Sequence, residues 1–166
     1  MFLFYNKDSN TKLHWLKLMK NFNIPPVWTF ISMIFAVMLH FIYPVVFFHF
    51  LAIDTGIIGI GLYLIIASPI WFKRKNTTII PRRKPTTLIV DGPFKMSRNP
   101  MYLGMILLSF GFGLSLGSFQ AIIPSVWLFF FLKNNYVLPE ERKLMEAMGE
   151  EAERYFSKTG RWIWFL

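Results

Sequence analysis

Three hydrogen-bond donors, Arg98, Asn99 and Tyr102, stand where a basic loop meets an apolar segment, in the stretch GPFKMSRNPMYLGM over 92–105. A guanidinium, a carboxamide and a phenol together suit an anionic group such as a carboxylate. Pro100, which comes next, favours the first turn of a helix. A purely structural interpretation stays open as well, because an arginine can anchor a helix to lipid headgroups and a tyrosine can belong to an interfacial aromatic belt.

Two adjacent carboxylates, Glu140 and Glu141, follow a later apolar segment. Acidic residues favour the first turn of a helix, which is one explanation for the pair. Glu141, however, shares a helical face with three apolar residues, Leu144, Met145 and Met148. A carboxylate on such a face needs a cationic partner. The candidates for that partner are a ligand ammonium, Arg98 and Lys95.

The composition indicates an integral membrane protein. The chain of 166 residues is 54% hydrophobic and 19% aromatic, with a mean hydropathy of +0.43, which is more apolar weight than a soluble domain of this length carries. The formal net charge is +9, but a nucleic-acid-binding module would be polar overall. We therefore expect the positive charge to face lipid headgroups and to set topology, with no nucleic acid bound. The absence of cysteine and the scattered histidines predict no metal site.

Four apolar segments are long enough, or nearly so, to cross a bilayer as helices. Lysine and arginine are confined to three blocks that alternate with these segments, over 7–20, 73–98 and 133–161. Four spans place all three blocks on one side, which the positive-inside rule makes cytoplasmic, together with both termini. We therefore expect an all-α, multi-pass integral membrane protein with spans at about 24–43, 51–72, 100–116 and 120–138.

These spans are expected to form a single membrane domain over 1–166, with the first two spans in 1–72. The rest, 73–166, contains the loop, a tight hairpin of spans three and four, and an amphipathic cytoplasmic helix over 139–155 that Pro139 opens. A Gly113-x-x-x-Gly117 spacing predicts close helix packing in the third span, and the segment GIIGIG over 56–61 predicts the same in the second. Because the hairpin opens toward the cytoplasm, the loop donors and the glutamate pair must be neighbours there.

The second half of the chain resembles a known family. The segments KPTTLIVDGPFKMSRNPMYLGM and PEERKLMEAMGEEAERYFSKTGRW resemble the membrane-embedded methyltransferases of the isoprenylcysteine carboxyl methyltransferase-like and phospholipid methyltransferase-like type. The matching region, 77–162, is about half of the chain. The resemblance implies S-adenosylmethionine bound at the cytoplasmic end of the helices and a hydrophobic or membrane-associated acceptor that enters from the bilayer.

The resemblance also implies which residues contact the cofactor. The cofactor-binding glutamate of the family falls on Glu140, with Glu141 beside it, and either carboxylate suits the cofactor ammonium, while Arg98 suits its carboxylate. The implied cofactor-binding set is Thr86, Thr87, Leu88, Ile89, Phe94, Arg98, Asn99, Pro100, Met101, Tyr102, Glu140 and Glu141. In-line placement of the acceptor in a site that excludes water is then the main catalytic requirement.

Several positions depart from the family pattern. Asn99 replaces a histidine, as in bacterial-type members, and Phe94 replaces a tyrosine. Tyr136 stands where the prenylcysteine enzymes have an arginine that binds the substrate carboxylate, a departure that weighs against a prenylcysteine substrate. Carboxylate, amine, thiol and phenol acceptors are all compatible with the implied cofactor site. Arg161, the candidate for a catalytic role, either orients an anionic acceptor or anchors the C-terminal tail to phosphate headgroups.

Two other functions stay open. A nicotinamide-dependent membrane reductase of the sterol-reductase type has a similar C-terminal arrangement, although the pair Glu140 and Glu141 would repel the phosphates of its cofactor. A non-enzymatic protein that binds anionic lipid through the basic segment 73–84 would also fit the charge distribution.

Overall fold

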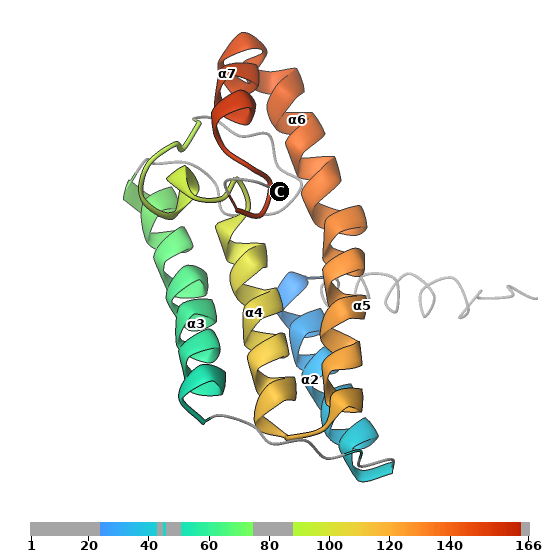
Figure 1. The fold of residues 1–166 in the computed structure, drawn as a ribbon. Helices are drawn as coiled ribbons and strands as arrows, with labels where there is room; N and C mark the ends of the chain where they lie inside the picture. The colour runs from blue at the N-terminus through green and yellow to red at the C-terminus, as the bar shows by residue number, and fades with distance from the viewer. Residues whose placement is uncertain (1–23, 43–44, 46–50, 75–87, 164–166) are drawn as a thin grey trace, which may run out of the picture.

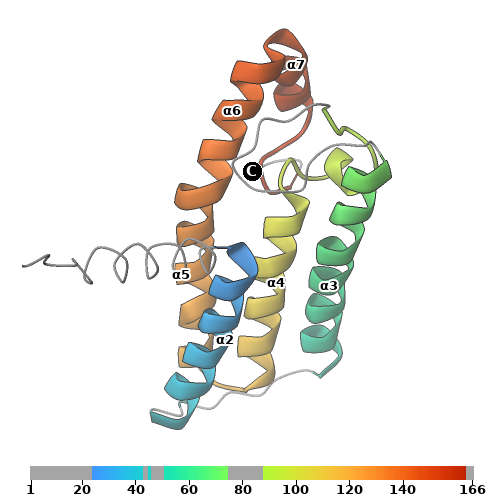
Figure 2. The same cartoon turned by 180° about the vertical axis from the view of Figure 1, so that it is seen from behind.

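The computed structural model describes residues 24–42, 45, 51–74 and 88–163, and the regular elements in these ranges are all helices. Four of them, α2 (Pro25–Ile42), α3 (Leu51–Arg74), α4 (Pro100–Ser115) and α5 (Ile123–Leu132), run side by side as a bundle (Figures 1 and 2). Helix α4 packs against α2, α3 and α5. The predicted all-α membrane architecture is therefore confirmed.

In the part of the chain that the structure describes, three helices are long and apolar enough to cross a bilayer, namely Pro25–Ile42, Ala52–Arg74 and Phe119–Met148. Their outward side chains are large and apolar, as at Phe30, Tyr63 and Trp127, which are 68%, 64% and 45% exposed. Such a surface suits lipid rather than water. The third predicted span, α4, has 16 residues and a length of about 24 Å, less than the hydrocarbon thickness of about 30 Å. It is shielded by the three helices that it contacts.

The predicted close packing through the 56–61 segment is confirmed at Gly61, which meets Gly104 of α4. A Cβ on Gly61 would lie 2.8 Å from the Gly104 carbonyl oxygen, and one on Gly104 would lie 2.7 Å from the Gly61 carbonyl oxygen. The prediction of packing through Gly113-x-x-x-Gly117 is wrong. Gly113 lies against the Ala121 carbonyl within the α4–α5 hairpin, and Gly117, with φ 68°, lies beyond the end of α4.

The sequence predicted that the fourth span ends just before Pro139, but the helix continues past this residue. The single-turn 3₁₀ helix η2 (Phe119–Ile122) and α5 lead into a π-helical turn, η3 (Lys133–Val137), and then into α6 (Leu138–Met148), within one continuous helix over Phe119–Met148. The predicted cytoplasmic helix over 139–155 is also broken, because Gly149 adopts φ 51° and ψ −122° between α6 and α7 (Glu150–Lys158). Pro139 therefore lies inside a helix, and the chain turns back at Gly149.

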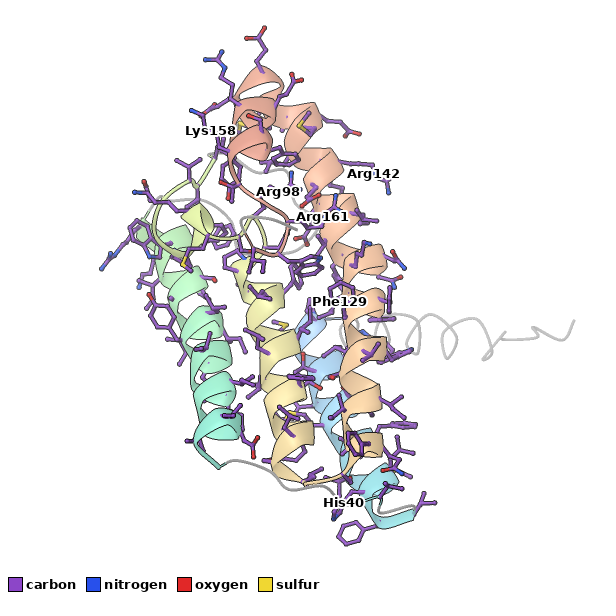
Figure 3. The ribbon with its side chains drawn as sticks, viewed as in Figure 1. His40, Arg98, Phe129, Arg142, Lys158 and Arg161 are labelled. Carbon is purple, nitrogen blue, oxygen red and sulfur yellow. The ribbon has the colours of Figure 1, made fainter. Side chains whose placement is uncertain are left out.

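Charge separates the two ends of the bundle. Arg98, Arg142, Lys158 and Arg161 lie at the end where α6 and α7 stand, and His40 lies at the other end (Figure 3). The arrangement follows from the even number of crossings, two each time, between successive basic blocks, which the four-helix topology reproduces. Which end faces the cytoplasm stays a prediction.

Candidate functional site

The loop that precedes α4 is fixed on the end of α3. Its single-turn 3₁₀ helix η1 (Gly92–Lys95) begins at Gly92, whose φ of 59° favours glycine. A Cβ at Gly92 would overlap the indole ring of Trp71. Phe94 then packs edge-to-face on Phe72, with 5.4 Å between ring centroids. These contacts fix the position from which the chain enters the polar segment before α4.

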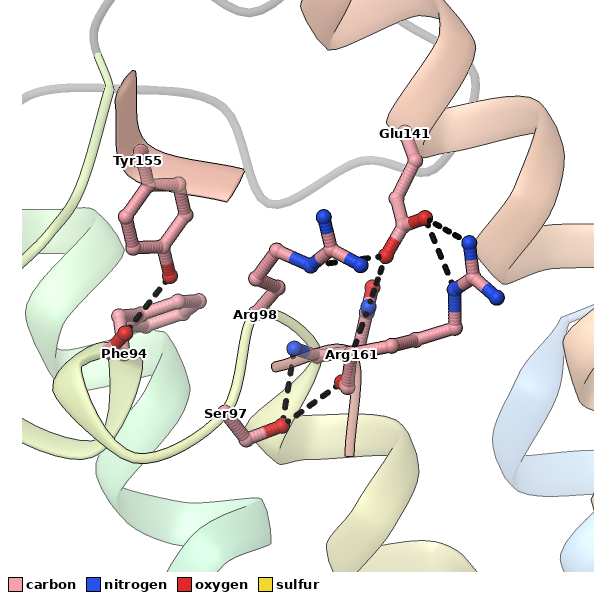
Figure 4. A network of polar contacts seen from close by, with 7 residues as sticks. Phe94, Ser97, Arg98, Glu141, Tyr155 and Arg161 are labelled. Carbon is pink, nitrogen blue, oxygen red and sulfur yellow. Dashed lines mark hydrogen bonds and ion pairs between the residues drawn. The ribbon is translucent and has the colours of Figure 1, made fainter. Parts of the chain in front are cut away.

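Glu141 is the centre of the site. This residue is 7% exposed, and its side chain lies between two guanidinium groups (Figure 4). Arg161 approaches Glu141 Oε2 with Nε and Nη2, both at 2.9 Å, and Arg98 Nε lies 3.4 Å from Glu141 Oε1. Asn99 Nδ2 donates to the same Oε1 at 2.9 Å. The predicted cationic partner of Glu141 is thus Arg98, together with Arg161.

Backbone and hydroxyl contacts join the loop to the C-terminal tail. The Arg98 N–H donates to the Gly160 carbonyl at 3.0 Å. Ser97 Oγ donates to the Arg161 carbonyl at 3.1 Å and accepts from the Asn99 N–H at 3.1 Å (Figure 4). Asn99 Nδ2 also lies 3.3 Å from that Arg161 carbonyl. Three hydrogen bonds to the Gly160 and Arg161 carbonyls therefore place the tail beside the start of α4.

Helix α7 covers the cluster from the other side. The Tyr155 hydroxyl donates to the Phe94 carbonyl at 2.6 Å, and the Arg98 guanidinium lies 4.1 Å from the centre of the Phe156 ring. Burial raises the pKa of Tyr155 above its ordinary value, although the Arg98 charge opposes this shift. Burial also lowers the pKa of Arg98, and here the opposing charge is Glu141. A tyrosine that stays neutral keeps donating to Phe94.

Glu140 has a different environment from its neighbour. It is partly exposed and accepts a hydrogen bond from the Tyr102 hydroxyl at 2.9 Å. The Tyr102 ring in turn lies 6.1 Å from that of Tyr136. The hairpin therefore brings the loop donors and the glutamate pair together, as predicted. It does so in two separate pairings, Asn99 with Glu141 and Tyr102 with Glu140.

The other predicted site residues lie around these two pairings. Ile89, Phe94, Asn99, Pro100 and Tyr102 are buried, and Leu88, Arg98 and Met101 are partly buried. Thr86 and Thr87 lie outside the described residues. The candidate catalytic residue Arg161 has two of its nitrogens on Glu141, an arrangement that orients Glu141 and the tail.

Sequence reasoning missed two features of the site. One is the tie from Ser97 to the tail, although a serine two residues before a helix-opening asparagine is a known signal for a local side-chain turn. The other is the contact of Phe156 with Arg98, because the sequence predicted one unbroken helix over 139–155. The break at Gly149 redirects that ring toward the loop.

This bundle, with a polar site at one end of apolar helices, is a fold found in membrane methyltransferases. It is similar to the structure of the eukaryotic intramembrane Ras methyltransferase isoprenylcysteine carboxyl methyltransferase, with a TM-score of 0.52 and 19% sequence identity. The similarity covers 84% of this chain and 52% of that one, so the chain spans about half the length of that structure. Residues 50–151 match the phospholipid methyltransferase family, and the chain therefore belongs to that family. No curated protein matches the chain.

Proposed function

We propose that the protein transfers a methyl group from S-adenosylmethionine to a hydrophobic or membrane-associated small acceptor at the cytoplasmic face of the membrane. One observation carries this proposal. The two glutamates of α6 lie side by side in the chain, yet Glu141 is buried between two guanidiniums and Glu140 is partly exposed beside Tyr102. One end of the bundle thus combines an excess of positive charge with a separate carboxylate, as a zwitterionic ligand requires.

The charge balance supports a ligand carboxylate near Arg98. Arg98, Arg161 and Glu141 together carry one net positive charge, with Arg98 and Glu141 largely buried. Within the described residues, Arg98 Nε is buried without a well-aligned hydrogen bond, although Glu141 Oε1 lies 3.4 Å away. A buried N–H of this kind is costly unless an acceptor is supplied. A carboxylate such as that of S-adenosylmethionine is a suitable acceptor.

The proposed roles follow from these environments. Glu140 would pair with the cofactor ammonium, and Arg98 with its carboxylate. Glu141 would hold Arg98, Arg161 and Asn99 in place without contacting the cofactor. The loop residues Thr86, Thr87, Leu88, Ile89 and Phe94, with Pro100 and Met101, would flank the remainder of the cofactor. We assign Arg161 a positioning role, in keeping with its two contacts to Glu141.

When bound, the cofactor supplies a methyl group that its positive sulfur already activates. The chain would then contribute binding, orientation and the exclusion of water, which together account for most of the barrier reduction in such a site. Tyr155 and Phe156, which contact the Phe94 carbonyl and Arg98, are buried or partly buried over the cluster. These rings would keep water from the reacting groups.

Aromatic contacts support an acceptor that comes from the lipid. Tyr136 lies 6.3 Å from Phe131, which contacts Trp28 at 4.5 Å and Trp127 at 5.0 Å, measured between ring centroids. Trp127 is 45% exposed on the outer surface of the bundle. Aromatic side chains thus connect the site with the lipid-facing surface, where a hydrophobic acceptor would dissolve.

Family membership favours methyl transfer over the two other functions considered. A nicotinamide-dependent reductase would have to place phosphates near Glu140, which is an unfavourable arrangement of like charges. A protein that only binds anionic lipid would not need the buried cluster around Glu141.

The reaction is tested by incubating the purified protein with S-adenosylmethionine that carries a labelled methyl group, in the presence of a membrane lipid extract. Label is expected in the apolar fraction. Glu140→Gln should lower the yield at least about tenfold because a charged hydrogen bond is lost, and Glu146→Gln, on the exposed side of the same helix, should leave it unchanged. Label absent from all lipid and protein fractions would contradict the proposal.

A further inference from the structure

The π-turn between α5 and α6 is an unusual feature of this bundle. Its five residues, Lys133–Val137, lie inside the continuous helix Phe119–Met148. The Leu138 N–H donates to the Lys133 carbonyl, five residues back rather than four. A turn closed in this way contains one residue more than an α-helical turn, and such turns are often found at functional sites.

Two residues explain why the turn is stable here. Pro139 has no N–H for the Asn135 carbonyl, four residues earlier, and its ring would clash with that carbonyl in a regular helix. The wider turn directly before Pro139 relieves this clash. Asn135 then donates from Nδ2 to the Phe131 carbonyl at 2.9 Å, which satisfies a backbone acceptor next to the disturbed turn.

The extra residue determines where Glu140 points. Glu140 lies 12 residues after Leu128, a fully buried residue of α5. In an unbroken α-helix this spacing would turn Glu140 about 120° away from the direction of Leu128. Because the π-turn absorbs one residue, the difference falls to about 20°. Glu140 therefore stays on the side of the helix that faces α4.

The contacts of the neighbouring residues agree with this rotation. Tyr136, one turn before Glu140, is 1% exposed and lies 6.1 Å from Tyr102 between ring centroids. The Tyr102 hydroxyl donates to Glu140 at 2.9 Å. Val137 and Glu141 repeat the spacing, with 0% and 7% exposure. A helix turned by one residue would lose both the Tyr102–Glu140 and the Asn99–Glu141 hydrogen bonds.

We propose that the π-turn, supported by Asn135 and Pro139, is the positioning element that sets the rotation of α6 and so aims Glu140 at the ligand site and Glu141 at Arg98. The part concerning ligand binding rests on the proposed function. The part concerning helix rotation does not.

The rotation is tested with single-residue length changes. Deleting Asn134 together with Pro139→Ala makes a regular α-helix possible and leaves Glu140 within about 20° of Leu128. Inserting one alanine between Asn134 and Asn135 turns Glu140 by about 100°. The reporter is a short bis-maleimide cross-link between Tyr102→Cys and Glu140→Cys, which is unambiguous because the chain has no native cysteine. Binding of S-adenosylhomocysteine is measured separately in chains that retain Tyr102 and Glu140.

The deletion chain is expected to keep the cross-link, with a binding constant for S-adenosylhomocysteine within about threefold of that of the unaltered chain. The insertion chain is expected to lose the cross-link and to bind S-adenosylhomocysteine at least about tenfold more weakly. A deletion that abolishes the cross-link, or an insertion that keeps it, would overturn the proposal. If the cross-links follow the prediction while the unaltered chain binds no S-adenosylhomocysteine, the helix rotation stands and the proposed function fails.

A second pair of variants does not change the length of the helix. Asn135→Ala removes the hydrogen bond to the Phe131 carbonyl, and Asn134→Ala is its matched control, since both side chains are exposed. We expect Asn135→Ala to weaken S-adenosylhomocysteine binding by about two- to tenfold and to lower the cross-link yield in the reporter chain. Asn134→Ala should change neither. Equal behaviour of the two variants in the cross-link assay would overturn the role of Asn135.

Discussion

At the residue scale, the site separates two glutamates that are identical in chemistry and adjacent in sequence. Glu141 accepts from Arg161 and Asn99 and pairs with Arg98, and Glu140 accepts from Tyr102. The need of Glu141 for a cation could be predicted, because a carboxylate on an apolar face requires one. The second guanidinium, Arg161, could not, since it depends on where the tail lies after the turn at Gly149.

Removing the Glu141 charge should destabilise the fold more than removing that of Glu140. Glu141→Gln leaves two partly buried guanidiniums without their anion, and we expect a loss of about 3 kcal/mol in the free energy of unfolding. Glu140→Gln should cost less than about 1 kcal/mol. Denaturant unfolding in detergent, followed by tryptophan fluorescence, compares the two variants. Equal losses would contradict the different roles assigned to them.

Tyr155 should give the protein a specific sensitivity to high pH. Its pKa is raised above the ordinary value of 10.0 in the fold, mainly by burial. The neutral phenol is therefore favoured in the folded state, and its contribution to stability is complete below pH 10.0 and is lost as the pH rises above it.

The measurement is the thermal midpoint of the unaltered chain and of Tyr155→Phe between neutral and strongly alkaline pH. At neutral pH Tyr155→Phe should be less stable by about 1–3 kcal/mol, because the Phe94 carbonyl loses its donor. The difference in stability between the two chains should become smaller as the pH becomes strongly alkaline. A difference in stability that does not change with pH would argue against a raised pKa for Tyr155.

At the element scale, the position of each helix depends on a few close contacts. The α2 and α3 spans were predicted from apolar length almost to the residue, because lipid imposes a simple rule on composition. The π-turn and the break at Gly149 were not predicted. Pro139 is compatible both with a first turn and with a tolerated interior position, and only packing against α4 decides between them. The predicted packing of Gly61 is confirmed, whereas that of Gly117 was wrong because sequence spacing does not show where α4 ends.

A pair of glycines in α3 tests this packing. Gly61→Ala would place a Cβ 2.8 Å from both the Gly104 carbonyl oxygen and the Leu108 nitrogen, so α3 and α4 must separate. We expect a loss of about 1–3 kcal/mol. Gly59→Ala faces open space and should be neutral or stabilising by up to about 1 kcal/mol, because alanine favours a helix more than glycine does. The denaturation midpoints of the two chains, measured in the same detergent, should move in opposite directions. At the least, their free energies of unfolding should differ by the loss expected for Gly61→Ala.

At the scale of the whole molecule, the separation of charge along the bundle predicts its orientation. The described lysines and arginines of α3, η1, α6, α7 and the tail belong to the end that carries the site, and His40 belongs to the other (Figure 3). From the positive-inside rule we then predict that the site lies on the cytoplasmic side. This placement fits a water-soluble cofactor that arrives from one side and an acceptor that arrives through lipid.

Accessibility of single cysteines checks the orientation. Glu153→Cys in α7 and Phe119→Cys at the hairpin turn are both exposed positions at opposite ends, and there is no native cysteine to interfere. In intact cells, a membrane-impermeant maleimide should label Phe119→Cys and should label Glu153→Cys only after permeabilisation. The reverse pattern would place the site outside the cytoplasm.

The most direct test of the central claim is calorimetric titration of S-adenosylhomocysteine into the detergent-solubilised protein. We expect saturable binding to the unaltered chain and to Glu146→Gln, and an affinity lowered at least about tenfold in Glu140→Gln because the partner of the ligand ammonium is lost. No binding at high micromolar ligand, or an unchanged affinity in Glu140→Gln, would contradict the account.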